Sequence, residues 1–173
     1  MIQHINDADL YYEEYGQGDR YILSSMQIFD PNGKGWPFDL ADEGFHVFLI
    51  QMRGYGQSTH IYENYNNNWY DVWADDVWAF ARAQGIPHFL YTGQSDGAAI
   101  GWHLYFRHPE VLVGFAGLAP GPHSRENLFV TPPRQRSMET ISDPAAREQM
   151  AQYQRQLMLQ FAKKFADDPE LRE

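Results

Sequence analysis

Short apolar runs alternate along this chain with segments in which apolar residues recur every three or four positions. The runs have the length of strands and cover residues 21–25, 46–50, 89–92 and 112–118. A near-continuous apolar run of this length is typical of a strand buried on both faces of a sheet. Because the strands alternate with helical patterns and short turns, the order predicts parallel strands joined by right-handed crossovers.

The helical patterns between these runs predict three helices in the first part of the chain. A short helix is expected over 36–43, and a longer one over 96–108 leads away from the third run. The clearest helix is 69–84, in which Trp69, Trp73, Val77, Phe80 and Ala81 fall at helical spacing. Its charged residues are expected on other faces, and these are Asp71, Asp75, Asp76 and Arg82.

Residues 1–15 predict two short strands around the turn cluster Asn6–Asp9. Together with the parallel strands, this hairpin completes the expected fold. We predict a three-layer α/β/α architecture whose sheet is mostly parallel and carries an antiparallel hairpin at its N-terminal end.

The composition changes after residue 119, which suggests a boundary between a core (1–124) and a helical segment (125–173). Ser142-Asp143-Pro144 has the features of a helix start, with proline at the first helical position. A single apolar stripe follows and indicates a helix to about residue 166; its members are Ala146, Met150, Tyr153, Leu157, Phe161 and Phe165.

Composition and charge narrow the class of protein. The 173 residues are 43% hydrophobic, as expected of one folded domain, and the net charge of −10 argues against a nucleic-acid partner. With no cysteine, disulfides and thiolate zinc sites are excluded. No apolar run approaches the length of a membrane span, and we expect a cytoplasmic protein. Neither metal-ligand spacing of histidines nor a phosphate or dinucleotide loop is present, so no metal or other cofactor is expected.

The chemistry of the chain centres on Gly93-Gln94-Ser95-Asp96-Gly97, which lies between an apolar run and a helical segment. A Gly-x-Ser-x-Gly pattern at a strand-to-helix turn is the signature of a nucleophile elbow. The alternative is an ordinary turn that happens to contain serine. The neighbouring strand and helix favour the elbow, with Ser95 as nucleophile.

In this context the chain resembles the N-terminal part of the α/β-hydrolase superfamily, over about residues 2–120. Four stretches carry the resemblance: Tyr12-Glu13-Glu14-Tyr15-Gly16-Gln17-Gly18, Arg53-Gly54-Tyr55-Gly56-Gln57-Ser58, the elbow, and Arg107-His108-Pro109-Glu110-Val111. It is most similar to the esterases, lactonases and C–C hydrolases of that superfamily. By this resemblance the helical segment 125–173 is part of a cap, cut short within this chain.

The resemblance implies an oxyanion hole made of two backbone N–H groups. One donor would be the amide of Asp96, and the other that of Gln27 or Met26, with Gln27 favoured. Many relatives have His-Gly at this second position, where this chain has Ser25-Met26. The Asp96 side chain adds a local negative charge or holds a substrate hydroxyl, or else only favours the helix N-terminus.

A serine nucleophile needs a base and an acid, and the family places both later in the chain than the elbow. His103 and His108 lie on the elbow helix and are poorly placed. We therefore expect the catalytic histidine and acid on sequence that this chain lacks. Candidates to line the substrate pocket are Asp30, His123 and Trp69, of which His123 is also a less favoured candidate base.

Three hypotheses remain open from the sequence. The first is a serine hydrolase acting on a small ester, lactone or related acyl substrate, of which this chain is the N-terminal part. The second is a non-catalytic binding protein whose exposed edge after strand 112–118 is covered in a homo-oligomer. The third is a site completed by a second polypeptide.

The aromatic residues between 55 and 73 have two possible roles. They line an apolar pocket under the cap, or they only cover the sheet.

Overall fold

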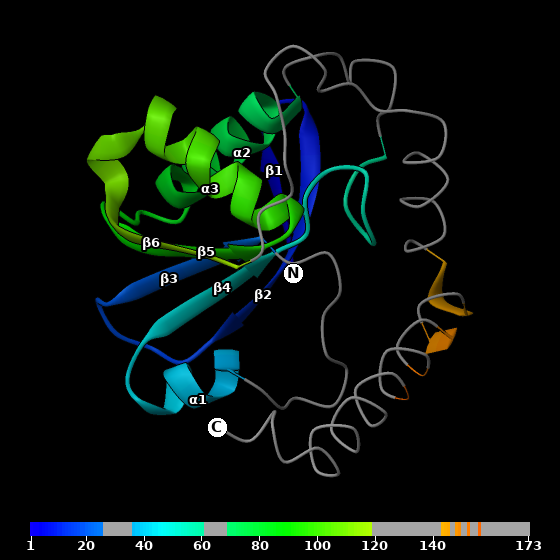
Figure 1. Cartoon of the computed structure of the whole chain (residues 1–173), viewed down its shortest axis with the longest axis horizontal. Helices are drawn as coiled ribbons and strands as arrows, with labels where there is room; N and C mark the ends of the chain where they lie inside the picture. Colours follow the sequence, from blue (N-terminus) through cyan, green and yellow to red (C-terminus); the bar gives the residue numbers. More distant parts are fainter. Residues whose placement is uncertain are drawn as a thin grey trace, which may run out of the picture.

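The computed structural model describes residues 1–25, 36–60 and 69–118, and scattered positions between 143 and 156. In these ranges the chain forms one six-stranded sheet with helices on both faces (Figure 1). The strands are β1 (Ile2–Ile5), β2 (Ala8–Tyr15), β3 (Tyr21–Ser25), β4 (His46–Ile50), β5 (Phe89–Gln94) and β6 (Leu112–Leu118). The helices are α1 (Trp36–Asp42), α2 (Trp69–Ala83), α3 (Asp96–Arg107) and the 3₁₀ turn η1 (Pro109–Val111).

The strand order is β1-β2-β4-β3-β5-β6. β1 pairs antiparallel with β2, and β2 pairs antiparallel with β4. The pairs β4–β3, β3–β5 and β5–β6 are parallel. The predicted mixed sheet, with an antiparallel hairpin beside parallel strands, is confirmed. Because β3 and β5 are central neighbours, their carboxyl ends bring Ser25 and Gly93 into register.

The two faces of the sheet carry separate apolar clusters, so the three-layer prediction is also confirmed. On one face α2 and α3 pack over the sheet, with Trp73, Val77 and Phe80 fully buried among strand residues (Figure 1). On the other face α1 covers a smaller cluster around Ile22, Val47 and Leu49. β3 and β4 are thus covered on both faces, which explains their apolar runs. For β6 the prediction of burial on both faces is wrong, because this strand lies at the edge of the sheet and is largely exposed.

The boundaries differ from the predicted ones by one or two residues. β5 continues to Gln94, two positions beyond the expected end, so the strand leads directly into Ser95. The segment after 143 has a helical start as expected, because the Ala145 N–H donates to Asp143 Oδ1 at 3.1 Å. The apolar stripe of that helix lies outside the described residues.

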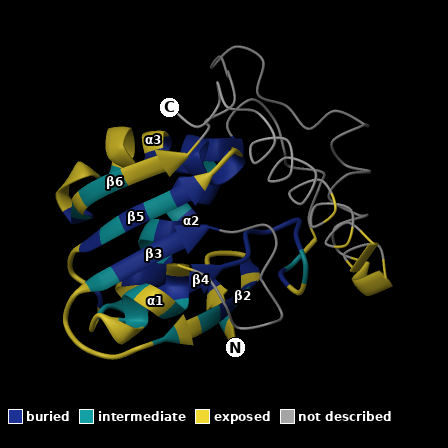
Figure 2. Cartoon of the chain, turned by 60° about the horizontal axis from the view of Figure 1, so that its bottom comes forward, coloured by how far each residue is buried: buried dark blue, intermediate teal, exposed yellow. Residues whose placement is uncertain are grey.

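β6 forms one edge of the sheet and is the least buried of the parallel strands (Figure 2). Val113 is 74% exposed and Leu118 62% exposed. The outer face of α3 adds exposed aromatics beside it, since Trp102 packs edge-on against Phe115 of β6. Across the described ranges, no helix has both the length and the apolar character needed to cross a membrane.

Candidate active site

Ser95 occupies the turn between β5 and α3 and has a backbone conformation that is rare for a residue with a side chain. Its φ is 55° and its ψ is −114°. Asn6 is the only other non-glycine residue with positive φ among the described residues. Such a conformation costs about 1–3 kcal/mol and persists only where the surroundings enforce it. The strain coincides with the serine that the sequence singled out.

Two glycines permit this turn, because backbone approaches backbone closely at both positions. A Cβ on Gly93 would lie 2.5 Å from the carbonyl oxygen of Gly97, inside any real Cβ contact. A Cβ on Gly97 would lie 2.5 Å from the carbonyl oxygen of Ser25, at the end of β3. The pattern Gly-x-Ser-x-Gly is therefore required here by packing of the turn on itself and on the neighbouring strand.

The turn presents Ser95 at the N-terminus of α3. The Ser95 amide donates to the Leu118 carbonyl at 3.0 Å, and its own carbonyl accepts the bond of the Ala99 amide at 3.1 Å. The amide of Asp96 precedes this first helical bond and lies where the helix dipole favours negative charge. Ser95 itself is exposed, whereas Asp96 is only 8% exposed.

The Asp96 side chain is held by two tyrosines from other parts of the chain. Tyr70 of α2 donates its hydroxyl to Oδ1 at 2.6 Å, and Tyr55 donates to Oδ2 at 3.4 Å. The residue pattern along the chain does not predict these bonds. The available signal was that a buried tyrosine hydroxyl needs a hydrogen-bond partner. The carboxylate is therefore bonded to protein groups.

Buried side chains at the carboxyl ends of β3 and β5 hold the backbone beside the Ser95 turn. The Tyr91 hydroxyl of β5 donates to the carbonyl of Gly97 at 2.9 Å, and burial raises the pKa of Tyr91 well above its ordinary value. Ser25 Oγ donates to Met52 Sδ at 3.3 Å. Both groups are buried, so the carboxyl ends of β3 and β5 are rigid beneath Ser95.

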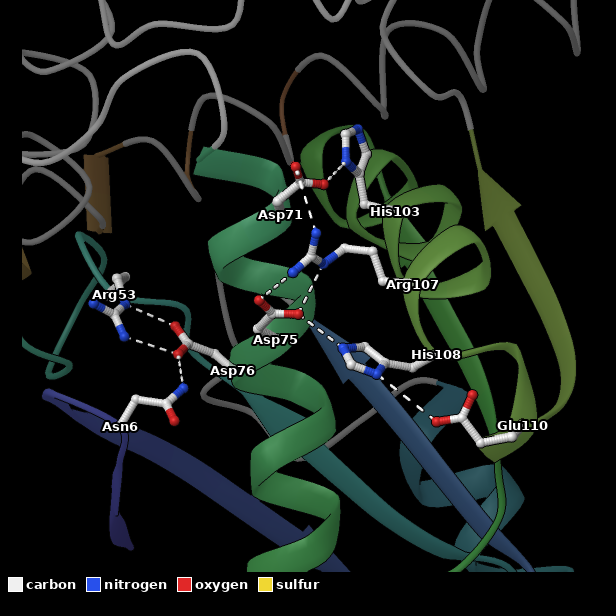
Figure 3. A network of polar contacts seen from close by, with 9 residues as sticks. All are labelled: Asn6, Arg53, Asp71, Asp75, Asp76, His103, Arg107, His108 and Glu110. Carbon is white, nitrogen blue, oxygen red and sulfur yellow. Dashed lines mark hydrogen bonds and ion pairs between the residues drawn. The ribbon is translucent and has the colours of Figure 1, made fainter.

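A buried ion pair anchors the loop that carries Tyr55 (Figure 3). Arg53 donates to both oxygens of Asp76 in α2, at 2.7 and 2.8 Å, and to Asp7 in the hairpin turn at 2.7 Å. Asn6 donates to Asp76 at 3.0 Å. Burial raises the pKa of Asp76 above its ordinary value, while the hydrogen bonds from Arg53 oppose the rise. The prediction that Asp76 lies on a polar face of its helix is wrong, because this side chain is 0% exposed.

A second, more exposed set of ion pairs joins α2 to α3 (Figure 3). His103 contacts Asp71 at 2.7 Å. Arg107 and His108 both contact Asp75, at 2.6 and 2.8 Å. Each of the six histidines in the described part of the chain has a partner elsewhere than Ser95; the other four are His4, His46, His60 and His88. His103 and His108 thus link helices, in keeping with the expectation that neither is the base.

Of the remaining candidate site residues, four fall outside the described residues: Met26, Gln27, Asp30 and His123. Trp69 is described and is 2% exposed. It packs against the rings of Tyr70 and Trp73, with centroids 4.2 and 4.3 Å away. Its burial among aromatics fits the alternative in which these rings seal the sheet, and its pocket role stays a prediction.

The fold and the turn agree with a comparison against known families. Residues 31–171 match the family model described as alpha/beta hydrolase fold. Since the match covers well over half of the chain, the chain belongs to the α/β-hydrolase family. This is the superfamily that the four sequence stretches resemble.

Individual relatives are hydrolases with several bond specificities. A bifunctional esterase/perhydrolase of Acinetobacter calcoaceticus is 25% identical over 94% of this chain and 55% of its own length. An AB hydrolase superfamily protein, YisY of Bacillus subtilis (strain 168), is 33% identical over 57% of this chain and 36% of its own. The solved structure of Est816, described as an N-acyl homoserine lactone degrading enzyme, superposes with a TM-score of 0.59 at 28% identity, covering 69% of this chain and 46% of that one. The chain thus spans about half, or less, of the length of these relatives.

Proposed function

We propose that this chain carries the nucleophile of a serine hydrolase that acts on a small ester, lactone or related acyl substrate. The observation that carries the proposal is the strained backbone of Ser95 at an exposed turn between β5 and α3. Backbone strain at an exposed serine lowers the stability of the fold. A nucleophile elbow accounts for it, because such an elbow holds its serine on a sharp, strained strand-to-helix turn.

In the proposed reaction, Ser95 Oγ attacks the substrate carbonyl carbon and forms a tetrahedral intermediate. Its proton passes to a histidine base, which returns it to the leaving alcohol as the carbonyl re-forms. The Asp96 amide, together with that of Gln27 or Met26, stabilises the oxyanion. Water then hydrolyses the acyl-enzyme. We propose that the base and its acid partner lie on sequence beyond this chain.

The substrate class is supported by what the relatives are described as doing. An esterase and a lactone-degrading enzyme are among the similar proteins at 25–28% identity. Both kinds of substrate contain an acyl carbonyl bonded to oxygen, and both are opened by attack at that carbon. No cofactor is needed for this step, since the serine, a base and two amides supply the chemistry.

Labelling with a fluorophosphonate probe tests the proposal directly. The wild-type chain and Ser95→Ala are compared, each alone and each joined to the C-terminal half of a related hydrolase. We expect adduct mass on the Ser95 peptide of the wild type, with the joined chain reacting faster because it contains the base. A joined wild-type chain that reacts no faster than Ser95→Ala would contradict the proposal.

The edge of the sheet supports a second candidate, a protein completed by another copy of itself. The β6 sequence Leu112–Leu118 carries no charge and no proline, the devices that normally protect an edge strand. Two β6 edges pairing antiparallel about a two-fold axis would also bring the exposed Phe106 and Trp102 faces together. Sedimentation velocity over a range of concentrations tests this, with Val113→Lys expected to dissociate the assembly. A monomer at every concentration would exclude it.

A further inference from the structure

We propose that the Asp96 carboxylate is a positioning group, which fixes the elbow so that the Asp96 amide points at the developing oxyanion. This inference rests on the proposed function of Ser95. It assigns a role to Tyr70 and Tyr55 as well, because their hydroxyls hold the carboxylate at 2.6 and 3.4 Å.

Three separate elements meet at this carboxylate. Asp96 begins α3, Tyr70 belongs to the first turn of α2, and Tyr55 lies in the glycine-rich loop after β4. All three residues are buried, at 8%, 5% and 3% exposure. Hydrogen bonds to a carboxylate away from water are the stronger kind, and the 2.6 Å bond from Tyr70 is the shorter of the two.

Both tyrosines are themselves rigidly held. The Tyr70 ring packs on Trp69 and lies 5.5 Å from the ring of His103, which is bonded in turn to Asp71. The loop of Tyr55 is closed by two backbone bonds, from the Tyr55 amide to Met52 and from the Ser58 amide to Tyr55. The donors therefore present fixed positions to which Asp96 is tied.

The two simpler roles for this side chain account for less of the geometry. A helix-dipole role acts through the negative charge alone and requires no hydrogen-bond partner for the carboxylate. A role in holding substrate requires an accessible carboxylate, whereas Asp96 is 8% exposed and bonded to two hydroxyls. Positioning explains why the residue directly after Ser95 reaches back to α2.

Positioning matters because the oxyanion donor is main chain. The amide of Asp96 moves with its Cα, and displacing a catalytic donor by about 1 Å costs on the order of a hundredfold in rate. The strained backbone of Ser95 would relax by rotating this same peptide unit if nothing opposed it. The two tyrosine bonds oppose that relaxation from the side of α2.

The test uses Asp96→Ala, Asp96→Asn, Tyr70→Phe and Tyr55→Phe in the chain joined to a related C-terminal half. Tyr105→Phe is the matched control, since it removes the same hydroxyl from an exposed position on α3. The first readout is fluorophosphonate labelling, separated into its maximal rate and its half-saturating concentration. The second is hydrogen exchange of the Ser95 and Ala99 amides, which donate to the Leu118 and Ser95 carbonyls, in the 173-residue chain.

We expect Asp96→Ala and Tyr70→Phe to lower the maximal labelling rate at least about tenfold, with the half-saturating concentration little changed. Tyr55→Phe should have a smaller effect because its bond is longer. Asp96→Asn should recover most of the loss, since its amide oxygen still accepts from Tyr70. Exchange of the Ser95 and Ala99 amides should quicken in Asp96→Ala and Tyr70→Phe, less so in Tyr55→Phe, and not in Tyr105→Phe.

Labelling and exchange in Tyr70→Phe and Asp96→Ala that match Tyr105→Phe would overturn the inference. If the wild type is not labelled at all, the proposed function fails, and the exchange data alone decide the positioning role. If Asp96→Ala does not fold, Tyr70→Phe against Tyr105→Phe decides it in the same way.

Discussion

Arg53 and Asp76 form a two-nitrogen ion pair in which the carboxylate has no exposed surface and the guanidinium almost none. The two hydrogen bonds are 2.7 and 2.8 Å long, and the side chains are 6% and 0% exposed. Asp76 lies in the middle of the buried face of α2, between Trp73 and Phe80. The pair fixes the loop after β4, and with it Tyr55, against the helix that carries Tyr70.

Replacing Asp76 by Asn is expected to lower the free energy of unfolding by about 3 kcal/mol. The reason is that Arg53 would keep its charge in a buried position without its main partner. Urea denaturation of the purified chain measures the change. Asp42→Asn, at the exposed end of α1, is the control and should change stability by about 0.5 kcal/mol or less.

A double variant sharpens this prediction. Arg53→Met with Asp76→Leu removes both charges together, so it should lose less stability than Asp76→Asn alone. Equal losses in the single and double variants would show that the helix face, and not the unpaired charge, determines the cost.

The link between α2 and α3 predicts a weaker, pH-dependent contribution to stability. Burial alone would raise the pKa of Asp75, but hydrogen bonds from Arg107 and His108 hold it below its ordinary value of 3.8. A carboxyl whose pKa is lower in the folded state stabilises the fold above the ordinary pKa. That stability is lost as the pH falls below 3.8 through the folded value.

The measurement is the free energy of unfolding of wild type and Asp75→Asn from about pH 5 to about pH 3. The difference between them should be constant at the upper end and shrink below pH 3.8. It should be small and reduced by salt, because the Asp75 and Arg107 side chains are 36% and 38% exposed. A difference that grows on acidification would contradict the assigned ion pairs.

The sequence predicted the parallel strands and the tight strand-to-helix turn at Ser95 because their signals are local. Residues 46–50 form an apolar run with no alternation, which is typical of a strand covered on both faces. Gly93 and Gly97 flank a serine at the end of such a run, and the structure shows that each glycine is required by a backbone contact. In both cases a few adjacent residues are enough to predict the local structure.

Such local patterns do not predict contacts between segments that are distant in the sequence. Asp76 has the spacing of a core position, but its charge predicts a polar face, because its partner Arg53 comes from another element. The sequence leaves the role of Asp96 open because the tyrosines that bind it are 26 and 41 residues away. Side-chain pairing of this kind depends on how helices and strands from different parts of the chain cross. Residue spacing within one element gives no information about that crossing.

Gly97→Ala tests the packing of the elbow on β3. Its new Cβ would lie 2.5 Å from the Ser25 carbonyl oxygen, so α3 and β3 must separate. We expect a loss of about 1–3 kcal/mol in the free energy of unfolding, as for overpacked cores. Gly114→Ala is the control, since its nearest contact is Leu90 Cδ1 at an ordinary 3.9 Å. Equal stability of the two variants would show that the turn relaxes without cost.

Ser95→Gly is expected to stabilise the chain while abolishing its labelling. Glycine adopts φ 55° and ψ −114° without steric strain, whereas serine in this conformation is strained through its Cβ. Ser95→Ala is the matched comparison because it removes the same hydroxyl and keeps the Cβ. We expect Ser95→Gly to unfold with a free energy about 1 kcal/mol higher than Ser95→Ala, even after the greater freedom of glycine in the unfolded chain is counted.

The comparison separates strain from chemistry, since both variants lack the hydroxyl that we propose as the nucleophile. Thermal and urea unfolding of both variants supply the measurement. A Ser95→Gly chain that is no more stable than Ser95→Ala would mean that the turn imposes no strain on its serine. In that case the positive φ of Ser95 would be a consequence of the turn's geometry alone, and the selection of a strained hydroxyl for catalysis would lose its main physical support.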